Sequence, residues 1–248
     1  MDAHDLQPKP KRRLITSFAA GCLLLLYLAL CAGGIVLGRS QWTLQNAATP
    51  TVTPTTVPHI LVHAPADLDA VLQEDFSSNE RNWGLYYSNG KLEVVHGKLI
   101  LQTGVPNTQG VGINSRFAPT SEKYYIQADF STDVDAAEPY GLVFGLSTSQ
   151  STYYTFEIWP VSGFRLSKYN YGKWTVLIPY TRAAINPYPQ ATTLSVYFDR
   201  GKMELYIDGA LVSEYSDESY LRSKTIGVFI GNNEYRLLVD NFFVFDEK

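Results

Sequence analysis

The sequence is poor in cysteine, histidine and methionine. Its two cysteines, Cys22 and Cys31, lie near the amino terminus, and the 217 residues after Cys31 contain none. This larger part of the chain therefore has no disulfide, no thiol nucleophile and no cysteine-ligated zinc. It must be held together by the burial of apolar side chains. Only His96 lies beyond residue 63, so the commonest general base is nearly absent as well.

Sequence motifs of common enzymes are also missing. The chain contains no G-x-S-x-G nucleophile elbow, no H-E-x-x-H zinc helix and no phosphate-binding loop. Gly110 and Gly112 begin a string similar to a dinucleotide fingerprint, but no helical pattern follows to hold a pyrophosphate. These absences disfavour a catalytic function.

Charge is unevenly distributed along the chain. Residues 1–40 contain five Lys/Arg and two Asp, whereas the other 208 residues contain 15 Lys/Arg and 22 Asp/Glu, a net charge of −7. Because an acidic body repels polyanions, we expect no nucleic acid partner. Hydrophobic residues make up 45% of the chain, which is ordinary for a globular protein and excludes disorder throughout.

Residues 14–38 form an uncharged run of 25 residues. About 20 apolar residues cross a bilayer, whereas a cleaved signal peptide has an apolar stretch of only about 7–15. A basic cluster over residues 9–13 precedes the run, so the positive-inside rule keeps the amino terminus in the cytosol. We therefore predict a cytoplasmic tail over residues 1–13, a single transmembrane signal anchor in the lipid bilayer over 14–38, and export of the rest beyond the plasma membrane.

A lipoprotein is the alternative reading of this segment. Ala19-Ala20-Gly21-Cys22 is a loose match to a lipid-attachment box. The following residues, LLLLYLAL, are strongly apolar, whereas a mature lipoprotein would turn polar there. The transmembrane interpretation is therefore favoured.

Residues 39–71 read as an extracellular linker. Thr49–Pro58 contains five threonines and three prolines, a composition that favours an extended chain with no apolar face. Its hydroxyl groups could carry O-linked sugar. His59 and His63 have the spacing of a helical metal pair but no third ligand, so a solvated linker end is the simpler interpretation.

Residues 72–248 show the period-two alternation of half-buried strands. In residues 153–159, Tyr154, Phe156 and Ile158 share one face, and Tyr153, Thr155, Glu157 and Trp159 share the other. Turn signals separate such runs at Asn89-Gly90, Tyr171-Gly172, Arg200-Gly201 and Asp208-Gly209. Without crossover helices the strands must be antiparallel, so the sequence predicts an all-β sandwich or jelly roll. The first and last strands should be neighbours.

The order of motifs carries a resemblance to a known group of proteins. The motifs are, in chain order, Glu74-Asp75-Phe76, Trp83, Gly97-Lys98-Leu99, YIQADF at 125–130, YGLVF at 140–144, YYTF at 153–156, Gly163-Phe164, Trp174 and Asp240-Asn241-Phe242. In this order the chain resembles the concanavalin A-like lectin/glucanase superfamily. It is particularly similar to jelly-roll domains of bacterial surface proteins related to the 3-keto-disaccharide hydrolase family. The likeness covers residues 72–248 and implies a lectin-like β-sandwich.

The resemblance also implies a possible glycosidase activity, which needs two carboxylates about 5–5.5 Å apart in retaining enzymes. Hydrolases of the superfamily present these groups in an E-x-D-x-x-E string, and this chain has none. Glu157 is an acidic strand residue on the outward face, but its i±2 neighbours are Thr155 and Trp159. Catalysis is therefore disfavoured, and a glycoside-processing hydrolase is kept as an alternative.

A carbohydrate site is predicted on the outward aromatic face. If residues 153–159 and 163–170 form a hairpin, the side chains on this face are Tyr153, Glu157, Trp159, Arg165 and Tyr169, with Trp174 just beyond the next turn. Aromatic rings stack on the C–H face of sugars, while charged groups bind their hydroxyls. Gly141 and Gly145 on the adjacent strand should leave room for the ligand. The alternative is that these aromatics only cover strand backbones or pack under the proline-rich loop around residues 179–189.

A calcium site is a further possibility, because lectin-like sandwiches often carry this ion. Glu74, Asp75 and Asp240 could converge if the first and last strands pair, although solvated edge carboxylates are the simpler interpretation. The sequence thus predicts a membrane-anchored surface protein that recognises an extracellular glycan without catalysis. A hydrolase, or a structural or protein-binding surface domain, remains open as an alternative.

Overall fold

The structure, a computed structural model, describes residues 64–247 except 82, 87–89, 105–108, 115–117, 148, 150, 161, 221–222 and 232–234. These residues belong to one compact unit, 56–248. The predicted tail, the transmembrane segment and most of the linker lie outside the described residues. Within the described ranges no helix has the length and apolarity needed to cross a membrane.

The described residues form fifteen β-strands and no helix, which confirms the predicted all-β class. The strands are β1 (Leu68–Glu74), β2 (Trp83–Tyr86), β3 (Lys91–Val95), β4 (Lys98–Gln102), β5 (Gly110–Asn114), β6 (Lys123–Thr132), β7 (Tyr140–Leu146), β8 (Thr152–Trp159), β9 (Gly163–Asn170), β10 (Lys173–Arg182), β11 (Thr192–Asp199), β12 (Lys202–Ile207), β13 (Ala210–Ser216), β14 (Thr225–Ile230) and β15 (Leu237–Glu247). The first strand begins inside the segment expected to be linker.

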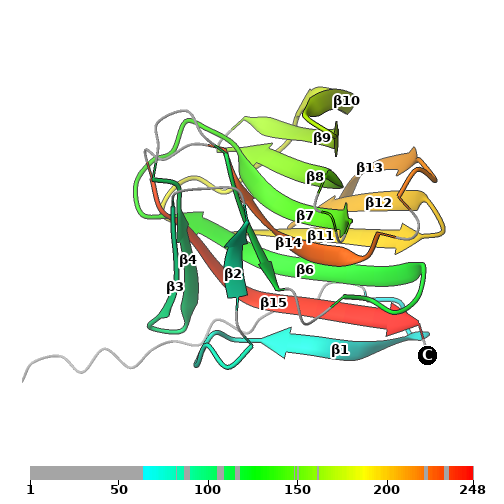
Figure 1. The fold of residues 1–248 in the computed structure, drawn as a ribbon. Helices are drawn as coiled ribbons and strands as arrows, with labels where there is room; N and C mark the ends of the chain where they lie inside the picture. The colour runs from blue at the N-terminus through cyan, green and yellow to red at the C-terminus, as the bar shows by residue number, and fades with distance from the viewer. Residues whose placement is uncertain are drawn as a thin grey trace, which may run out of the picture. The chain divides into compact units, whose positions relative to one another are not determined.

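The strands form two antiparallel sheets that pack face to face (Figure 1). The first sheet has the order β13-β12-β11-β6-β15-β4-β3. Its long strand β15 pairs with β6 along one edge, and with β4 and then β1 along the other. The expected pairing of the first and last strands is therefore confirmed, with Glu74 opposite Phe242.

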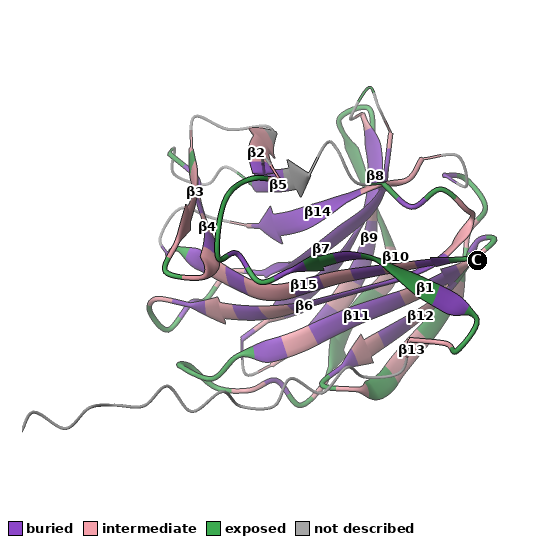
Figure 2. Ribbon diagram, turned by 90° about the horizontal axis from the view of Figure 1, so that it is seen from below, coloured by how far each residue is buried: buried purple, intermediate pink, exposed green. Residues whose placement is uncertain are grey.

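The second sheet has the order β10-β9-β8-β7-β14-β5-β2. Figure 2 shows that β7, β8 and β14, at its centre, are almost wholly buried. Its edge strand β10 is instead exposed along most of its length. The second sheet therefore has a buried middle and one open, polar and aromatic edge.

Hairpin turns in both sheets follow the predicted glycine signals. Tyr171-Gly172, Arg200-Gly201 and Asp208-Gly209 all have positive φ at both positions, as a type I′ turn requires. His96-Gly97 has the same conformation between β3 and β4, a turn that the sequence patterns above did not single out.

The core between the sheets is rich in aromatic rings. Tyr124 and Phe198 stack with centroids 5.0 Å apart on the first sheet, and Phe144 and Tyr154 stack at 5.4 Å on the second. Phe144 also contacts Phe198 at 6.5 Å, which joins the two layers. Each such buried ring contributes about 1.5–3 kcal/mol of burial free energy, so the domain needs no disulfide.

Candidate functional site

The predicted site residues of β8 and β9 do lie on one face of the second sheet. The two strands pair antiparallel, with Tyr153 opposite Tyr169 and Glu157 opposite Arg165. The alternate side chains of β8, including Phe156, enter the core between the sheets. The outer face therefore carries every residue of these two strands that was assigned to the site, because cross-strand partners in a sheet point the same way.

Tyr153, Tyr169 and Trp174 form an aromatic cluster at one end of this face. Tyr153 stacks on Tyr169 with centroids 4.8 Å apart, and Trp174 contacts Tyr153 edge-on at 5.7 Å and Tyr169 at 5.1 Å. Tyr153 is only 4% exposed, whereas Trp174 is 37% exposed. Tyr153 is therefore a packing residue beneath the cluster, and Trp174 is the member with an accessible ring surface.

Phe229 extends the aromatic cluster across the sheet, a contact that the sequence did not reveal. Its ring lies 6.4 Å from that of Trp174, although three strands separate β14 from β10 in the strand order. A flat sheet would place these two strands about 19 Å apart. The contact indicates that the sheet curls toward its outer face, and Figure 1 shows β10 curving at the top of the molecule.

Glu157, Arg165 and Trp159 form a second group, the charged cluster, at the other end of the same face. Nη2 of Arg165 lies 2.7 Å from Oε2 of Glu157, and the hydroxyl of Thr155 donates to Oε1 at 2.6 Å. The guanidinium carbon of Arg165 lies 4.7 Å from the Trp159 ring centroid. Glu157 has no exposed surface, so its carboxylate serves mainly to hold Arg165.

The two glycines expected to leave room for a ligand have other roles. A Cβ atom at Gly141 would lie 2.0 Å from the backbone oxygen of Phe156, so this glycine permits close pairing of β7 with β8. Gly145 has a φ of 60°, and its Cβ would lie 2.9 Å from the ring of Tyr154. The expectation of a glycine-lined ligand space was wrong.

Strand β10 contributes site residues that the sequence patterns did not assign. Pro179, expected in a loop, lies within this edge strand, where a residue without an N–H donor is tolerated. Two register shifts, between Val176 and Ile178 and between Ile178 and Thr181, interrupt its alternation. Tyr180 lies edge-on to Trp159, with centroids 5.8 Å apart. It follows Trp174 by six residues, so period-two alternation puts it on the same face once β10 is known to continue through Pro179.

An open recess lies beside this contact. Its volume is about 530 Å³, and it is lined by Ser162, Tyr180, Arg182, Ala183 and Ala184. Tyr180 is 48% exposed, so its ring is accessible from the recess. The outer face thus has two accessible ends, one at Trp174 and one at Tyr180.

Acidic groups are scarce on this sheet. Its seven strands contain a single Asp or Glu, Glu157. Glycoside hydrolysis by two carboxylates needs a partner at about 5–5.5 Å or 6.5–9.5 Å. Within the strands of this sheet Glu157 has no such partner.

The three carboxylates proposed for calcium each have other partners. Glu74 accepts a hydrogen bond from the Phe76 N–H at 3.1 Å and lies 3.4 Å from Arg81. Asp240 pairs with Lys98 at 3.1 Å, and Asp75 accepts a hydrogen bond from its own turn. The described part of the chain contains no group of three His, Cys, Asp or Glu side chains arranged for a metal ion.

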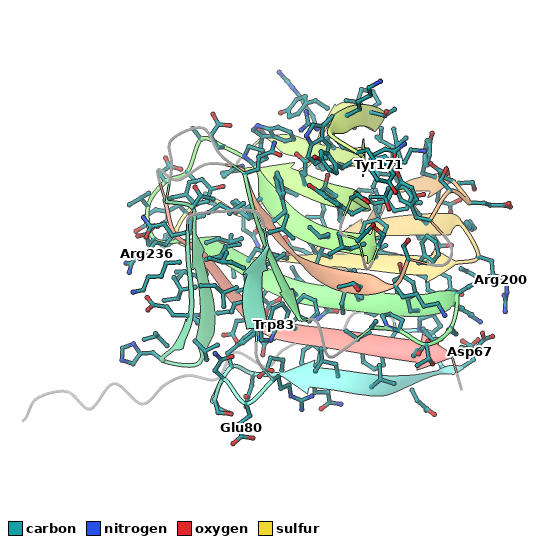
Figure 3. All side chains as sticks on the ribbon, viewed as in Figure 1. Asp67, Glu80, Trp83, Tyr171, Arg200 and Arg236 are labelled. Atoms are coloured by element: carbon teal, nitrogen blue, oxygen red, sulfur yellow. The ribbon has the colours of Figure 1, made fainter. Side chains whose placement is uncertain are left out.

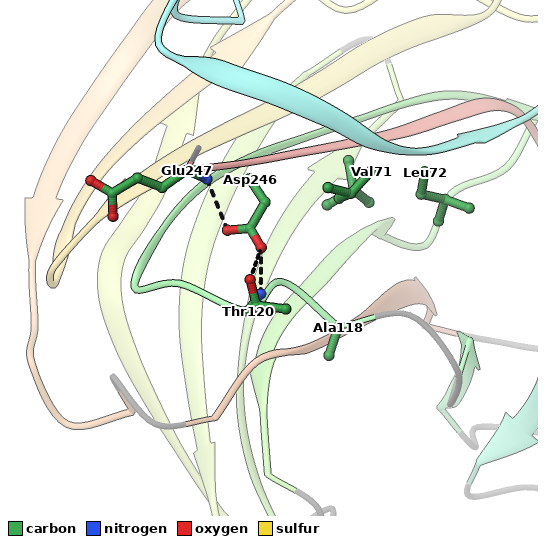
Figure 4. Close-up of a pocket in the computed structure, with 7 residues that line it drawn as sticks. Val71, Leu72, Ala118, Thr120, Asp246 and Glu247 are labelled. Carbon is green, nitrogen blue, oxygen red and sulfur yellow. Dashed lines mark hydrogen bonds between the residues drawn. The ribbon is translucent and has the colours of Figure 1, made fainter.

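A second recess lies at the first sheet, beside β1 and the C-terminal end of β15 (Figure 4). Its volume is about 330 Å³, and its carboxylate, Asp246, accepts hydrogen bonds from the Thr120 hydroxyl at 2.7 Å and from the Ser121 hydroxyl at 2.5 Å. Burial acts to raise the pKa of Asp246, but these donors and the adjacent amides hold it below its usual value. The carboxylate is therefore fully used in joining β15 to the loop before β6.

Comparison with solved structures identifies the fold. No family model matches the chain, and no curated protein is similar in sequence. The structure is similar to the carbohydrate binding module CBM66 from Bacillus subtilis, with a TM-score of 0.54 and 15% identity over 64% of this chain and 93% of that one. It is also similar to SCLam, a non-specific endo-β-1,3(4)-glucanase of family GH16, with a TM-score of 0.54 and 11% identity over 75% and 94% of the two chains.

A third similar structure is a Bacillus subtilis protein of unknown function with a galectin-like fold. Its TM-score is 0.55, with 12% identity over 71% of this chain and 95% of that one. At such identities the likeness concerns the fold. The described residues therefore share the two-sheet, antiparallel β-sandwich fold of these structures.

Proposed function

We propose that this protein is a membrane-anchored extracellular β-sandwich that binds carbohydrate, without catalysing a reaction, through the outer face of β8–β10. The observation that carries this proposal is the aromatic cluster. Trp174 presents an accessible ring while Tyr153 and Tyr169 hold it from below. An aromatic ring fixed in this way can stack on the apolar face of a sugar with little loss of side-chain entropy.

Exposed side chains around the cluster fit the same function. Tyr171, in the β9–β10 turn (Figure 3), is 74% exposed and adds a second exposed ring three residues before Trp174 in the chain. At the opposite end, Tyr180 and Trp159 supply further aromatic surface. An elongated glycan lying along β10 would meet both ends. Solved proteins of this fold include a carbohydrate binding module and glucanases, which supports a saccharide ligand.

The proposal of binding without catalysis rests on the small number of acidic residues on the outer face of the second sheet. Glu157, the sole acidic residue in its strands, has no exposed surface and is paired with Arg165. A carboxylate held in this way is poorly placed to protonate a glycosidic oxygen or attack a sugar. The hydrolase alternative draws on the similarity to GH16 glucanases. Hydrolysis of β-glucans by the protein, lost in Glu157→Gln, would favour it.

The membrane location is proposed from the sequence alone. Residues 14–38 have the length and apolarity of a membrane span, and the basic cluster before them sets its orientation. Protease treatment of intact cells tests it directly. We expect the β-sandwich to be digested or released from the outside, whereas protection from protease would contradict the proposed topology.

Glycan binding is tested on the full-length protein in detergent solution. A glycan array identifies ligands, and titration calorimetry then compares Trp174→Ala with Leu211→Ala. Leu211 is the control because it is also an exposed apolar side chain but lies on β13 of the other sheet. We expect Trp174→Ala to weaken binding about five- to ten-fold and Leu211→Ala to leave it unchanged. An array without any bound glycan, or equal affinities of both variants, would contradict the proposal and favour a structural or protein-binding domain.

A further inference from the structure

The charge of the proposed site differs from that of the rest of the exported chain. Residues 158–198 contain no Asp or Glu, and they contain four basic residues, Arg165, Lys168, Lys173 and Arg182. The 208 residues after position 40 carry a net charge of −7 in total. Strands β9 and β10 therefore form a basic edge on an otherwise acidic body.

Two of these four cations are neutralised by carboxylates. Arg165 pairs with Glu157 at 2.7 Å, and Lys168 pairs with Asp217 at 2.6 Å. The carboxylate of Asp217 also accepts a hydrogen bond from the Ser219 amide. These two pairs neutralise the charges of the basic groups of β9, so β9 itself has no unpaired positive charge.

Lys173 and Arg182 differ, because neither forms an ion pair with the described residues and both are exposed. They lie at the two ends of β10, roughly 25 Å apart along the strand. Only Arg182 lines the 530 Å³ recess, together with Tyr180 and Ser162. The recess therefore combines an unpaired guanidinium, an exposed aromatic ring and a hydroxyl group.

The backbone holds Arg182 in this place. Arg182 lies opposite Gly163 in the β9–β10 ladder, and a Cβ atom at Gly163 would lie 2.1 Å from the backbone oxygen of Thr181. Only glycine allows β10 to approach so closely here. The Tyr180 ring packs edge-on against Trp159. The Arg165 guanidinium lies over the ring of the same Trp159. The backbone of Arg182 and the ring of Tyr180, which both line the recess, are thus held by contacts with β9 and β8.

We propose that this recess binds a sugar unit that carries an oxyanion, a carboxylate or a phosphate. The inference rests on the proposed carbohydrate function and names the class of its ligand. A guanidinium donates two parallel hydrogen bonds to such an anion, which a neutral hydroxyl cannot accept in the same way. Tyr180 would contact the apolar face of the same ring. The Ser162 hydroxyl donates to the Trp159 carbonyl oxygen at 3.3 Å, so it would accept a hydrogen bond from a neighbouring sugar hydroxyl. The preferred glycan is therefore acidic.

Titration calorimetry of the full-length protein in detergent solution tests this inference with three probes. They are tetragalacturonate, its methyl ester as a neutral ligand of the same shape, and glucose 6-phosphate. The variants are Arg182→Gln and the control Lys173→Gln, which removes the same charge from the other end of the strand. The wild type should bind tetragalacturonate if the recess prefers a carboxylate, or glucose 6-phosphate if it prefers a phosphate. We expect Arg182→Gln to bind that probe about ten-fold or more weakly than the wild type. Lys173→Gln should change the affinity less than two-fold.

Each other outcome overturns a distinct statement. If the methyl ester binds as tightly as the acid, the protein binds saccharides but the acidic preference is wrong. Equal losses in Arg182→Gln and Lys173→Gln would indicate diffuse attraction without a site. Binding of anionic phospholipid vesicles that is lost in Arg182→Gln, with no saccharide bound, would assign the recess to a membrane surface. Failure of every glycan on the array would remove the proposed function together with this inference.

Discussion

Nη2 of Arg165 lies 2.7 Å from Oε2 of Glu157, a carboxylate with no exposed surface on the outer face of the second sheet. The two residues are direct partners in the β8–β9 ladder. Their pairing neutralises the sole acidic residue of seven strands and orients the guanidinium over Trp159. The face is therefore better suited to binding than to acid–base chemistry, and several of its contacts can be tested separately.

Glu157→Gln should destabilise the protein. The amide keeps the size of the side chain and can still accept a hydrogen bond from Thr155, but it leaves Arg165 without its counter-charge. Removing one member of a buried charged hydrogen bond costs about 1–3 kcal/mol, and the partial exposure of Arg165 favours the lower end. The free energy of unfolding measured in urea checks this value.

Glu214→Gln is the matched control for that experiment. Glu214 lies 3.6 Å from Lys202 with both side chains about half exposed, and such surface pairs contribute at most about 1 kcal/mol. We expect its free energy of unfolding to stay within about 0.5 kcal/mol of the wild type. Equal effects of the two substitutions would show that the Glu157–Arg165 pair has no special stabilising role.

Asp246 should make stability dependent on pH in the acidic range. The hydroxyl and amide donors of Thr120 and Ser121 outweigh burial and hold its pKa below the usual value of 3.8. A depressed pKa in the folded state stabilises the fold above the unfolded pKa, and this stabilisation is lost as the pH falls through the folded pKa.

Comparison with Asp246→Asn isolates this contribution. At pH 7 we expect the variant to have a free energy of unfolding lower by about 2 kcal/mol, the value of hydrogen bonds to a charged group. The difference between the two proteins should be constant down to about pH 5 and should shrink below about pH 4. A difference that is the same at pH 3 and pH 7 would contradict the role assigned to the ionised carboxylate.

Gly163→Ala should loosen the edge strand β10. The added Cβ atom would lie 2.1 Å from the backbone oxygen of Thr181, so β10 must move away. Overpacking of this kind costs about 1–3 kcal/mol. Gly84→Ala is the control, because its Cβ would have no atom within 4 Å. Hydrogen exchange should accelerate in β10 for Gly163→Ala alone, and unchanged exchange there would contradict the close approach.

Tyr153→Ala and Trp174→Ala should separate packing from binding within the aromatic cluster. Tyr153 is nearly fully buried between Tyr169 and Trp174. Its truncation creates a cavity and should cost about 3–5 kcal/mol of unfolding free energy. Trp174→Ala removes a partly exposed ring and should cost clearly less. If urea denaturation gives the two variants equal free energies of unfolding, the packing role assigned to Tyr153 is wrong.

The hairpins of the second sheet were predictable from local sequence. Alternation in residues 153–159 and 163–170, with Tyr171-Gly172 as the turn signal, placed the right side chains on one outer face, because strand residues alternate with a period of two. Glycine signals also located the turns before β12 and β13. These features depend on neighbours close in the chain.

The exposure of the same residues was not predictable from that pattern. Tyr153 and Glu157 were assigned to a sugar site, yet one is a packing residue and the other holds Arg165. Tyr180 and Phe229 were not assigned at all. A loop was expected around Pro179, whereas β10 continues through this proline to Arg182 and places the Tyr180 ring against Trp159.

By itself the sequence determined that the chain after the linker forms an antiparallel β-sandwich, and which side chains of each strand share a face. Both follow from the period of the backbone and from local turn chemistry. The tertiary structure alone decided which of those side chains remain accessible. The curl of the second sheet brings Trp174 to Phe229, and Gly163 brings β10 to β9 so that Arg182 lines a recess. Contacts of this kind join strands far apart in the chain, so they arise only when both sheets are assembled.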